Sequence, residues 1–135
     1  MVNRMRTLCL DDDPERHAWV KDLRRRDEVV CVFRYSEVIS ALERERWDLL
    51  FLDHDLADKV ADADYMGAVM YASDGGCRYY NGRDVAAWLV ANPGRCPPAI
   101  WIHSWSDHAE AMESILAPLK AAGVLVHLKR KQAPV

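Results

Sequence analysis

Short apolar runs alternate with amphipathic stretches along the first half of the chain. The runs that predict β-strands, because they are rich in apolar, β-branched or aromatic residues, are residues 7–10 (TLCL), 28–35 (EVVCVFRY) and 49–52 (LLFL). Asp13 followed by Pro14 is typical of a helix start, and Ser36 can cap a second helix. The first three predicted strands therefore succeed one another in βαβ order.

The same alternation returns in the second half, after a long interruption. Residues 57–81 have no clear apolar period, and a segment of that length inside a compact domain is typically functional or disordered. The later predicted elements are a helix that opens at Gly82, a strand over 99–102, a helix that opens at Ser106-Asp107 and a strand over 124–128. Pro118 is expected to break or kink the last helix, and Gly123 to end it.

This pattern predicts an α/β fold with a doubly wound, five-stranded parallel sheet. Each predicted strand is continuously apolar, which is typical of a sheet that helices cover on both faces. We expect one domain over residues 1–129, with 57–81 as an insertion loop after the third strand, and a short tail over 130–135. Nothing after Lys129 is long or apolar enough for a closing helix, so the insertion or a second subunit is expected to cover part of one face, and a homodimer is plausible.

Composition supports a single core and narrows the choice of partners. Hydrophobic residues make up 50% of the 135 residues, which is enough for one domain of common size. The net charge of -3 and the pI near 5.9 argue against a broad nucleic-acid-binding surface. Because no stretch approaches the length of a membrane span and no secretory h-region is present, we expect a soluble, cytoplasmic protein without a membrane partner.

The four cysteines do not form a recognisable metal or disulfide pattern. Cys9, Cys31, Cys77 and Cys96 are widely spaced and include no C-x-x-C pair, which fits neither a zinc site nor a disulfide framework. We interpret Cys9 and Cys31 as core residues. Cys77, in the Gly-rich part of the insertion, is the one cysteine worth testing for reactivity.

Ionisable residues follow most of the predicted strands, where the ligand crevice of an open parallel sheet lies. The polar residues on which the strands end are Asp11, Asp12 and Asp13 for the first, Asp53, His54 and Asp55 for the third, His103 and Ser104 for the fourth, and His127 and Lys129 for the fifth. Carboxylates brought together repel one another unless a cation or protons offset their charge, and an all-oxygen cluster suits Mg²⁺. The sequence therefore predicts a metal and phosphate site at this edge of the sheet.

Simpler explanations exist for several of these residues. Asp13 can be a helix cap, and Ser104 with Asp107 also matches a capping pattern. Either His54 or His103 alone is best interpreted as a packed histidine, whereas the two together can form a proton-transfer couple. The histidines interpreted as incidental are His17, His108 and His127.

Among the tryptophans, only Trp105 is predicted to contact a substrate. It follows Ser104 at the expected crevice, where an aromatic ring could stack on a base. Trp19 and Trp88 lie on apolar helix faces and Trp101 lies within a strand, so packing explains these three better.

The strand-end residues resemble those of the response-regulator receiver domain, and the resemblance spans nearly the whole chain. Asp11 and Asp12 in LCLDDDP match its metal-binding acidic pair. Asp53 in LLFLDHDL matches the phospho-acceptor aspartate, and Ser104 matches the conserved Ser/Thr. The resemblance implies the flavodoxin-like strand order 2-1-3-4-5, with Mg²⁺ between the carboxylates.

Several departures from an ordinary receiver argue against kinase-driven signalling. The short Met-Pro loop after the acceptor aspartate is replaced by His54-Asp55-Leu56 and a long insertion. The late Lys-Pro of receivers is missing, since Lys129 is followed by Arg130 and matches only approximately. The closing helix of the receiver fold is also expected to be absent.

The chain is more similar to a receiver derivative, the cyclic-phosphate processing receiver domain. The shared motifs are LDDD at 10–13, LDHDL at 52–56, GRDVAAWL at 82–89 and IHS at 102–104, and the pairing of LDHDL with IHS is the specific part. This resemblance implies processing of cyclic phosphate ends, in RNA repair or related nucleotide chemistry. The Asn-Pro that follows the HS pair in the family is replaced here by Trp105-Ser106-Asp107, which leaves the substrate open.

The leading hypothesis is a metal-assisted phosphoesterase that acts on a cyclic phosphate, such as a 2',3'-cyclic RNA or nucleotide end. Its partner would be a phosphate-containing small molecule or an RNA end. One histidine would activate water and the other would protonate the leaving oxygen, in an order that the sequence leaves open. The assigned residues are the Mg²⁺ ligands Asp11, Asp12, Asp53 and Asp55, the catalytic residues His54, His103, Ser104 and Asp53, and the weaker substrate contacts Trp105 and Lys129.

Two other functions remain as alternatives. In a phospho-accepting signalling receiver, Asp53 would attack a phosphoryl donor. In a non-catalytic binding module, a cyclic nucleotide or a protein would bind without reaction. Only the enzyme hypothesis requires the pair of His54 and His103, so these two residues separate the three functions.

Overall fold

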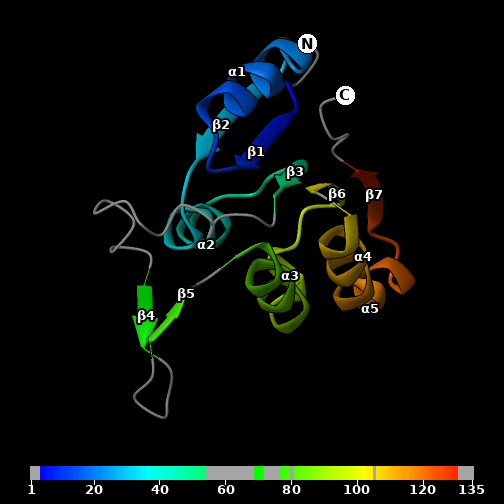
Figure 1. Ribbon diagram of the computed structural model, residues 1–135. Coiled ribbons are helices and arrows are strands. Elements are labelled where there is room, and N and C mark those ends of the chain that lie inside the picture. The colour runs from blue at the N-terminus through cyan, green and yellow to red at the C-terminus, as the bar shows by residue number, and fades with distance from the viewer. Residues whose placement is uncertain (1–3, 54–68, 72–76, 80, 105, 131–135) are drawn as a thin grey trace.

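The computed structural model describes residues 4–53, 69–71, 77–79, 81–104 and 106–130, which form an α/β fold around one five-stranded sheet (Figure 1). The strands of this sheet are β1 (Arg6–Leu10), β2 (Glu28–Val32), β3 (Leu49–Leu52), β6 (Ala99–Ser104) and β7 (Leu125–Arg130). They are all parallel and are ordered β2-β1-β3-β6-β7, which corresponds to 2-1-3-4-5 in chain order. The predicted fold class and strand order are confirmed.

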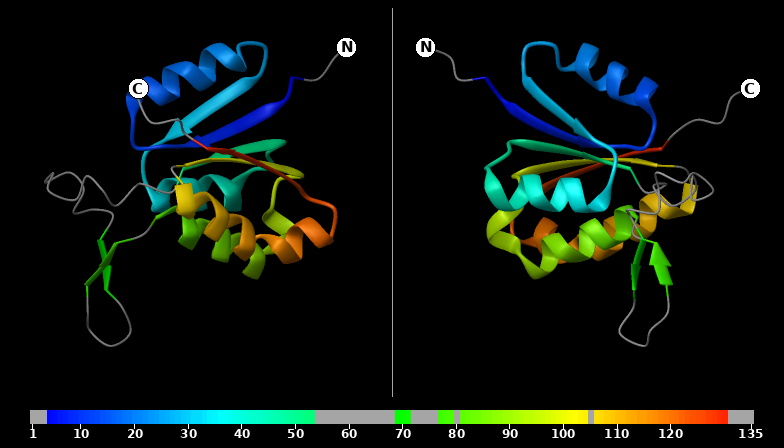
Figure 2. Two further views of the ribbon diagram at one scale, coloured as in Figure 1. Left: turned by 45° about the vertical axis from the view of Figure 1, so that its right-hand side comes forward. Right: turned by 90° about the vertical axis from the view of Figure 1, so that its left-hand side faces the viewer.

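Helices cover the two faces of the sheet unequally (Figure 2). The helices are α1 (Pro14–Leu23), α2 (Tyr35–Arg44), α3 (Gly82–Ala91), α4 (Ser106–Ile115) and α5 (Ala117–Ala121), with a short 3-10 helix over Pro93–Arg95. In the described part of the chain, α1 alone lies on one face, next to β1 and β2, and the other four α-helices lie on the opposite face. On the face of α1, Leu125 of β7 is 72% exposed.

Alternating side chains of each strand divide the core into two clusters. Leu8 and Leu10 of β1 belong to the larger cluster, which the helices of the four-helix face complete. Cys9, between them in sequence, belongs to the smaller cluster with Val20 of α1 and Phe51 of β3. Position 11 therefore shares the face of α1 with position 9. None of the helices in the described ranges has the length and apolar character needed to cross a bilayer.

Part of the segment predicted as a loop forms a β-hairpin. Strands β4 (Val69–Tyr71) and β5 (Cys77–Tyr79) pair antiparallel in a separate two-stranded sheet. The loop prediction over 57–81 was wrong for these residues, because strands of three residues are too short to produce an apolar period. Apart from Asn81, the rest of the segment lies outside the described residues.

Two predicted helix boundaries have different outcomes. Ser36 was expected to cap α2, but the helix begins at Tyr35, so Ser36 lies inside its first turn. The carboxylate of Glu37 instead accepts a hydrogen bond from the backbone N–H of Phe33 (3.2 Å), which fixes the entry of the chain into the helix. The break expected at Pro118 is confirmed, since α4 ends at Ile115 and α5 follows as a separate helix.

A capping box fixes the start of α3, directly after the insertion. The side chain of Asn81 accepts a hydrogen bond from the N–H of Arg83 (2.9 Å), and Asp84 accepts one from the N–H of Asn81 (2.9 Å). We expect Asn81→Ala to lower the free energy of unfolding by about 1 kcal/mol, measured by urea denaturation. The control is Arg83→Ala, which keeps the backbone N–H that Asn81 binds. Equal losses in the two variants would contradict the role of the cap.

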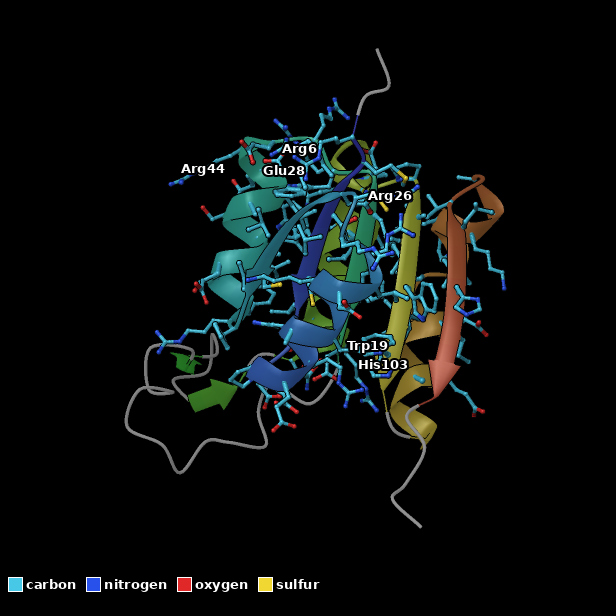
Figure 3. The ribbon with its side chains drawn as sticks, turned by 90° about the horizontal axis from the view of Figure 1, so that it is seen from above. Arg6, Trp19, Arg26, Glu28, Arg44 and His103 are labelled. Carbon is cyan, nitrogen blue, oxygen red and sulfur yellow. The ribbon has the colours of Figure 1, made fainter. Side chains whose placement is uncertain are left out.

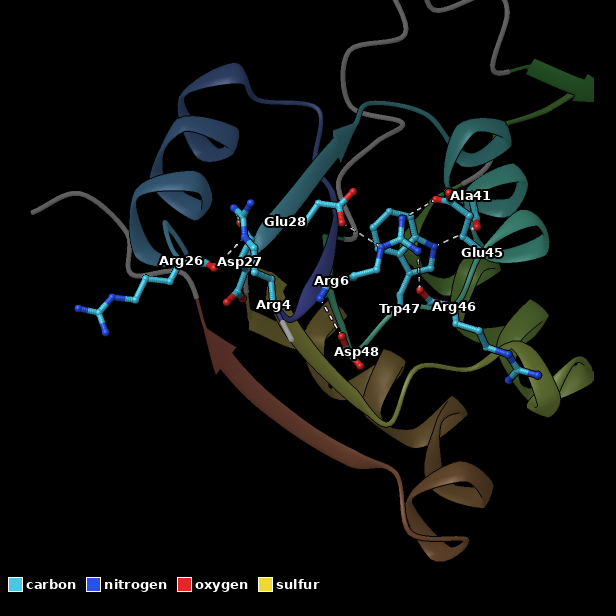
Figure 4. A network of polar contacts seen from close by, with 10 residues as sticks. All are labelled: Arg4, Arg6, Arg26, Asp27, Glu28, Ala41, Glu45, Arg46, Trp47 and Asp48. Carbon is cyan, nitrogen blue, oxygen red and sulfur yellow. Dashed lines mark hydrogen bonds and ion pairs between the residues drawn. The ribbon is translucent and has the colours of Figure 1, made fainter. Parts of the chain in front are cut away.

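A polar network holds the N-terminal ends of the strands (Figure 4). Arg6 donates hydrogen bonds to Glu45 (2.8 Å) and Glu28 (3.3 Å), and its guanidinium carbon lies 4.5 Å from the centre of the Trp47 ring. The backbone N–H of Arg6 also donates to Asp48 (2.7 Å), just before β3. These contacts fix the start of β1 against its neighbours and leave the carboxyl ends of the strands, at the other edge of the sheet, as the place for chemistry.

Candidate functional site

Three carboxylates meet at the carboxyl edge of the sheet. Asp11 and Asp12 follow β1 and Asp53 follows β3, and these two strands are hydrogen-bonded neighbours. One carboxylate oxygen of each residue lies within 4.8 Å of the others. Asp11 is 2% exposed and Asp53 is 1% exposed, so water screens their charges poorly. A hard divalent cation such as Mg²⁺ fits this donor set, because all of its ligands would be oxygen atoms.

Sheet hydrogen bonds continue beyond the strands and position the acids. The backbone N–H of Asp11 donates to Val32 of β2 (3.2 Å), and that of Asp53 donates to a carbonyl at the end of β1 (3.1 Å). The carboxylate of Asp11 also accepts a hydrogen bond from the N–H of Asp13 (3.0 Å). Asp13 itself caps α1 by accepting from the N–H of Glu15 (2.9 Å), as the simpler interpretation expected.

The imidazole of His103 lies near these acids, against two side chains of α1. His103 is in β6 and is 6% exposed. Its ring stacks on Trp19, with 5.6 Å between the ring centres and an angle of 19° between the planes (Figure 3). Nη1 of Arg16 is 3.2 Å from Nδ1 and 3.1 Å from Nε2 of His103. Because it is almost equally far from both nitrogens, the guanidinium packs against the ring and does not point along one lone pair.

Arg16 connects the histidine with the acids. Its Nε lies 3.8 Å from Oδ2 of Asp11, while its Nη1 contacts His103. A surface depression of about 250 Å³ lies beside it, lined by Asp13, Glu15, Arg16 and Trp19. A guanidinium in this position can donate hydrogen bonds to phosphate oxygens that approach a metal held by the acids.

Arg16 and Trp19 were not predicted as site residues. Both lie on α1, whereas the predicted site residues lie at strand ends, and packing alone was the explanation given for Trp19. The helix start at Asp13 was the sequence signal for these two residues. It places the beginning of α1 at the same edge of the sheet as the acids, so the first two turns of α1 face the site.

His17, interpreted as incidental, also contacts this region. It is 6% exposed, and its Nε2 donates a hydrogen bond to the backbone carbonyl of Asp11 (2.8 Å). Burial of the ring is the main cause that lowers the pKa of His17. His17 therefore connects α1 to the residue that begins the acidic cluster.

The remaining predicted site residues have mixed outcomes. His54, Asp55 and Trp105 lie outside the described residues. Ser104 is the last residue of β6, and Lys129 of β7 is the register partner of His103, but the side chains of Ser104 and Lys129 are not described. The structure therefore brings together Asp11, Asp12, Asp53 and His103 from the predicted set.

Solved structures of receiver domains are similar to this chain. A signal receiver domain from Vibrio parahaemolyticus is 17% identical, with a TM-score of 0.62 over 98% of this chain and 82% of that one. A Burkholderia pseudomallei response regulator with a phosphorylated aspartic acid, calcium ion and citrate is 15% identical, with a TM-score of 0.60 over 97% of this chain and 62% of that one. A CheY-like receiver from Methanospirillum hungatei is 17% identical, with a TM-score of 0.56 over 94% of this chain and 82% of that one. Likeness at these identities shows the fold alone.

The comparison with protein families is more specific. None of the curated proteins compared with the chain matches it. The family model described as the cyclic-phosphate processing receiver domain matches residues 6–118, a range that begins with β1 and includes the three acids, Arg16 and His103. The chain therefore belongs to the cyclic-phosphate processing receiver domain family.

Proposed function

We propose that the protein is a metal-assisted phosphoesterase that opens a cyclic phosphate, with 2',3'-cyclic RNA or nucleotide ends as the substrate class. The observation that carries the proposal is the convergence of three carboxylates, a guanidinium and an imidazole at one edge of the sheet. Membership of a family named for cyclic-phosphate processing supports the choice of substrate.

Asp11, Asp12 and Asp53 would hold the metal ion in this reaction. When bound, Mg²⁺ withdraws charge from the phosphoryl oxygens and so favours attack on phosphorus. The solved structure of the Burkholderia response regulator, which has a similar fold, contains a calcium ion. Asp55 stays a further predicted ligand, outside the described residues.

Arg16 and His103 would act on the substrate itself. The guanidinium of Arg16 would bind a phosphate oxygen and orient the ring of the cyclic phosphate. His103 would transfer a proton, either from the attacking water or to the leaving oxygen, and His54 would perform the other transfer. Trp19, which stacks on His103, would keep the imidazole plane fixed.

A second candidate function is phosphoryl acceptance at Asp53. The carboxylate of Asp53 follows β3 and belongs to the acidic cluster, and the Burkholderia relative carries a phosphorylated aspartic acid. This function needs the metal but neither histidine. It predicts that acetyl phosphate adds the mass of one phosphoryl group to Asp53.

The decisive experiment is end analysis of short RNAs that carry a 2',3'-cyclic phosphate. We expect the protein to convert the cyclic end to a phosphomonoester with Mg²⁺ and to leave it intact in EDTA. The same RNA with a linear 3'-phosphate is the control and should not change. If neither cyclic RNA ends nor cyclic mononucleotides are opened with Mg²⁺ or Mn²⁺, the phosphoesterase proposal fails, and phosphorylation of Asp53 would then favour the acceptor.

A further inference from the structure

Two thiols and an imidazole lie together beneath α1, on the side of β1 that faces away from the larger core cluster. Cys9 of β1 and Cys31 of β2 are register partners in the parallel sheet, and His17 comes from α1 above them. The sulfur atoms and one ring nitrogen of His17 all lie within 4.8 Å of one another. The absence of a C-x-x-C pair argued against a zinc site, whereas strand pairing brings Cys9 and Cys31 together from distant parts of the sequence.

These distances are close to those that a tetrahedral zinc site requires. With Zn–S bonds of about 2.3 Å and Zn–N bonds of about 2.0–2.1 Å, ligand atoms are roughly 3.5–3.8 Å apart. Atoms within 4.8 Å of one another can therefore close around an ion by side-chain rotation of about 1 Å each.

A hydrogen bond holds the ring of His17 beside the two thiols. A carbonyl oxygen can only accept, so Nε2 donates its proton to the carbonyl of Asp11 (2.8 Å), and an ion would have to bind Nδ1 of the neutral ring. Metal-binding histidines usually donate their other ring N–H to a carbonyl or a carboxylate in this way. The bond fixes both the tautomer and the orientation of the imidazole.

The two thiols differ in their surroundings. Cys9 is 1% exposed, whereas Cys31 is partly exposed. The neighbouring thiol of Cys9 is the main cause that lowers the pKa of Cys31, and the same contact, together with burial, raises the pKa of Cys9. Cys31 is therefore the most exposed member of the cluster, and an ion from solvent would reach it first.

We propose that Cys9, His17 and Cys31 form a binding site for a thiophilic divalent cation of the Zn²⁺ type, separate from the oxygen site of the three carboxylates. Thiolate and imidazole ligands favour Zn²⁺, whereas Mg²⁺ prefers carboxylates, so the two sites select different ions. The site does not depend on the phosphoesterase proposal. Because His17 also holds the carbonyl of Asp11, an ion bound here would stiffen the start of the acidic cluster.

Cobalt provides a direct test, since thiolate ligands give Co²⁺ an intense charge-transfer absorption. We expect the reduced protein to develop this band at one equivalent of Co²⁺, to lose it when Zn²⁺ is added, and to keep it in excess Mg²⁺. Cys31→Ser and His17→Gln should each weaken the affinity for Co²⁺. The expected loss is larger than the roughly 10- to 100-fold that follows when a residue that only hydrogen-bonds to a metal ligand is replaced. Cys96→Ser, which changes another partly exposed cysteine, should have no effect.

A measurement on the unmodified chain makes the test independent of the folding of variants. We expect Zn²⁺ to protect Cys31 from alkylation and to leave Cys96 reactive, as read by peptide mass spectrometry. The proposal is overturned if Co²⁺ gives no thiolate band, if the band persists in well-folded Cys31→Ser, or if Zn²⁺ leaves the alkylation of Cys31 unchanged.

Discussion

We expect Asp53→Asn to lower Mg²⁺-dependent opening of a cyclic phosphate by about 10³-fold. The Lewis-acid effect of a bound metal is worth several kcal/mol, and each 1.36 kcal/mol changes the rate tenfold, so the loss of about 4 kcal/mol gives this factor. The substitution removes one of the carboxylates that lie within 4.8 Å of one another and keeps the size of the side chain. Initial rates of cyclic-phosphate opening by the wild type and Asp53→Asn, measured across a Mg²⁺ titration, test this prediction.

The same variant should be more stable than the wild type when no metal is present. Asp53 and Asp11 are almost fully buried at the acidic cluster, so the removal of one negative charge relieves repulsion in the apo protein. Thermal unfolding in EDTA should therefore show a higher midpoint for Asp53→Asn, whereas Mg²⁺ should raise the midpoint of the wild type much more than that of the variant.

Asp13→Asn is the matched control for this comparison. It also removes one negative charge next to the cluster, and asparagine caps a helix as well as aspartate does, so the start of α1 is kept. The control should retain turnover and the response of the midpoint to Mg²⁺. If Asp53→Asn behaves like Asp13→Asn in both measurements, the three carboxylates are not the metal ligands.

The second large effect is expected at His103. We expect His103→Gln to lower kcat by about 10²- to 10⁴-fold, the usual contribution of one general acid or base, and to leave the response of the unfolding midpoint to Mg²⁺ unchanged. One limb of the pH–rate profile should also disappear, which a purely structural histidine would not cause. The measurements are kcat against pH and thermal unfolding with Mg²⁺.

His127→Gln is the control for the histidine experiment. His127 lies on the neighbouring strand β7, is exposed, and packs edge-on against Trp101 with ring centres 4.6 Å apart. Its replacement should leave kcat unchanged. Full turnover in both His103→Gln and His54→Ala would rule out the acid–base scheme, and the phosphoryl-acceptor function would gain weight because it requires neither histidine.

The parts of the site that could be predicted from the sequence are those that depend on strand order alone. Asp11, Asp12 and Asp53 follow apolar runs, and the carboxyl ends of parallel strands meet at one edge, so their convergence needed no knowledge of side-chain packing. The order of the strands was accessible through the receiver resemblance. His103 was predicted in the same way.

The parts that could not be predicted depend on how a helix packs or on which residues are register partners. Arg16 and Trp19 reach His103 only because of the rotation of α1 above the sheet. Cys9 and Cys31 meet because β1 and β2 pair in one register, and a shift of one residue would separate them. The rotation of α1 and the register of β1 with β2 are properties of the tertiary structure, and the spacing of motifs along the chain does not reveal them.

Residues of both proposed metal sites alternate with core leucines along β1 and at the position that follows it. Cys9 and Asp11 project toward α1, while Leu8 and Leu10 project into the larger core cluster. A single inserted or deleted residue in this strand would exchange the two faces, so that leucines would replace the ligands and charged groups would enter the core. The length of β1 is therefore less free to vary than the identity of its residues, and related chains should differ here by substitution and not by insertion or deletion.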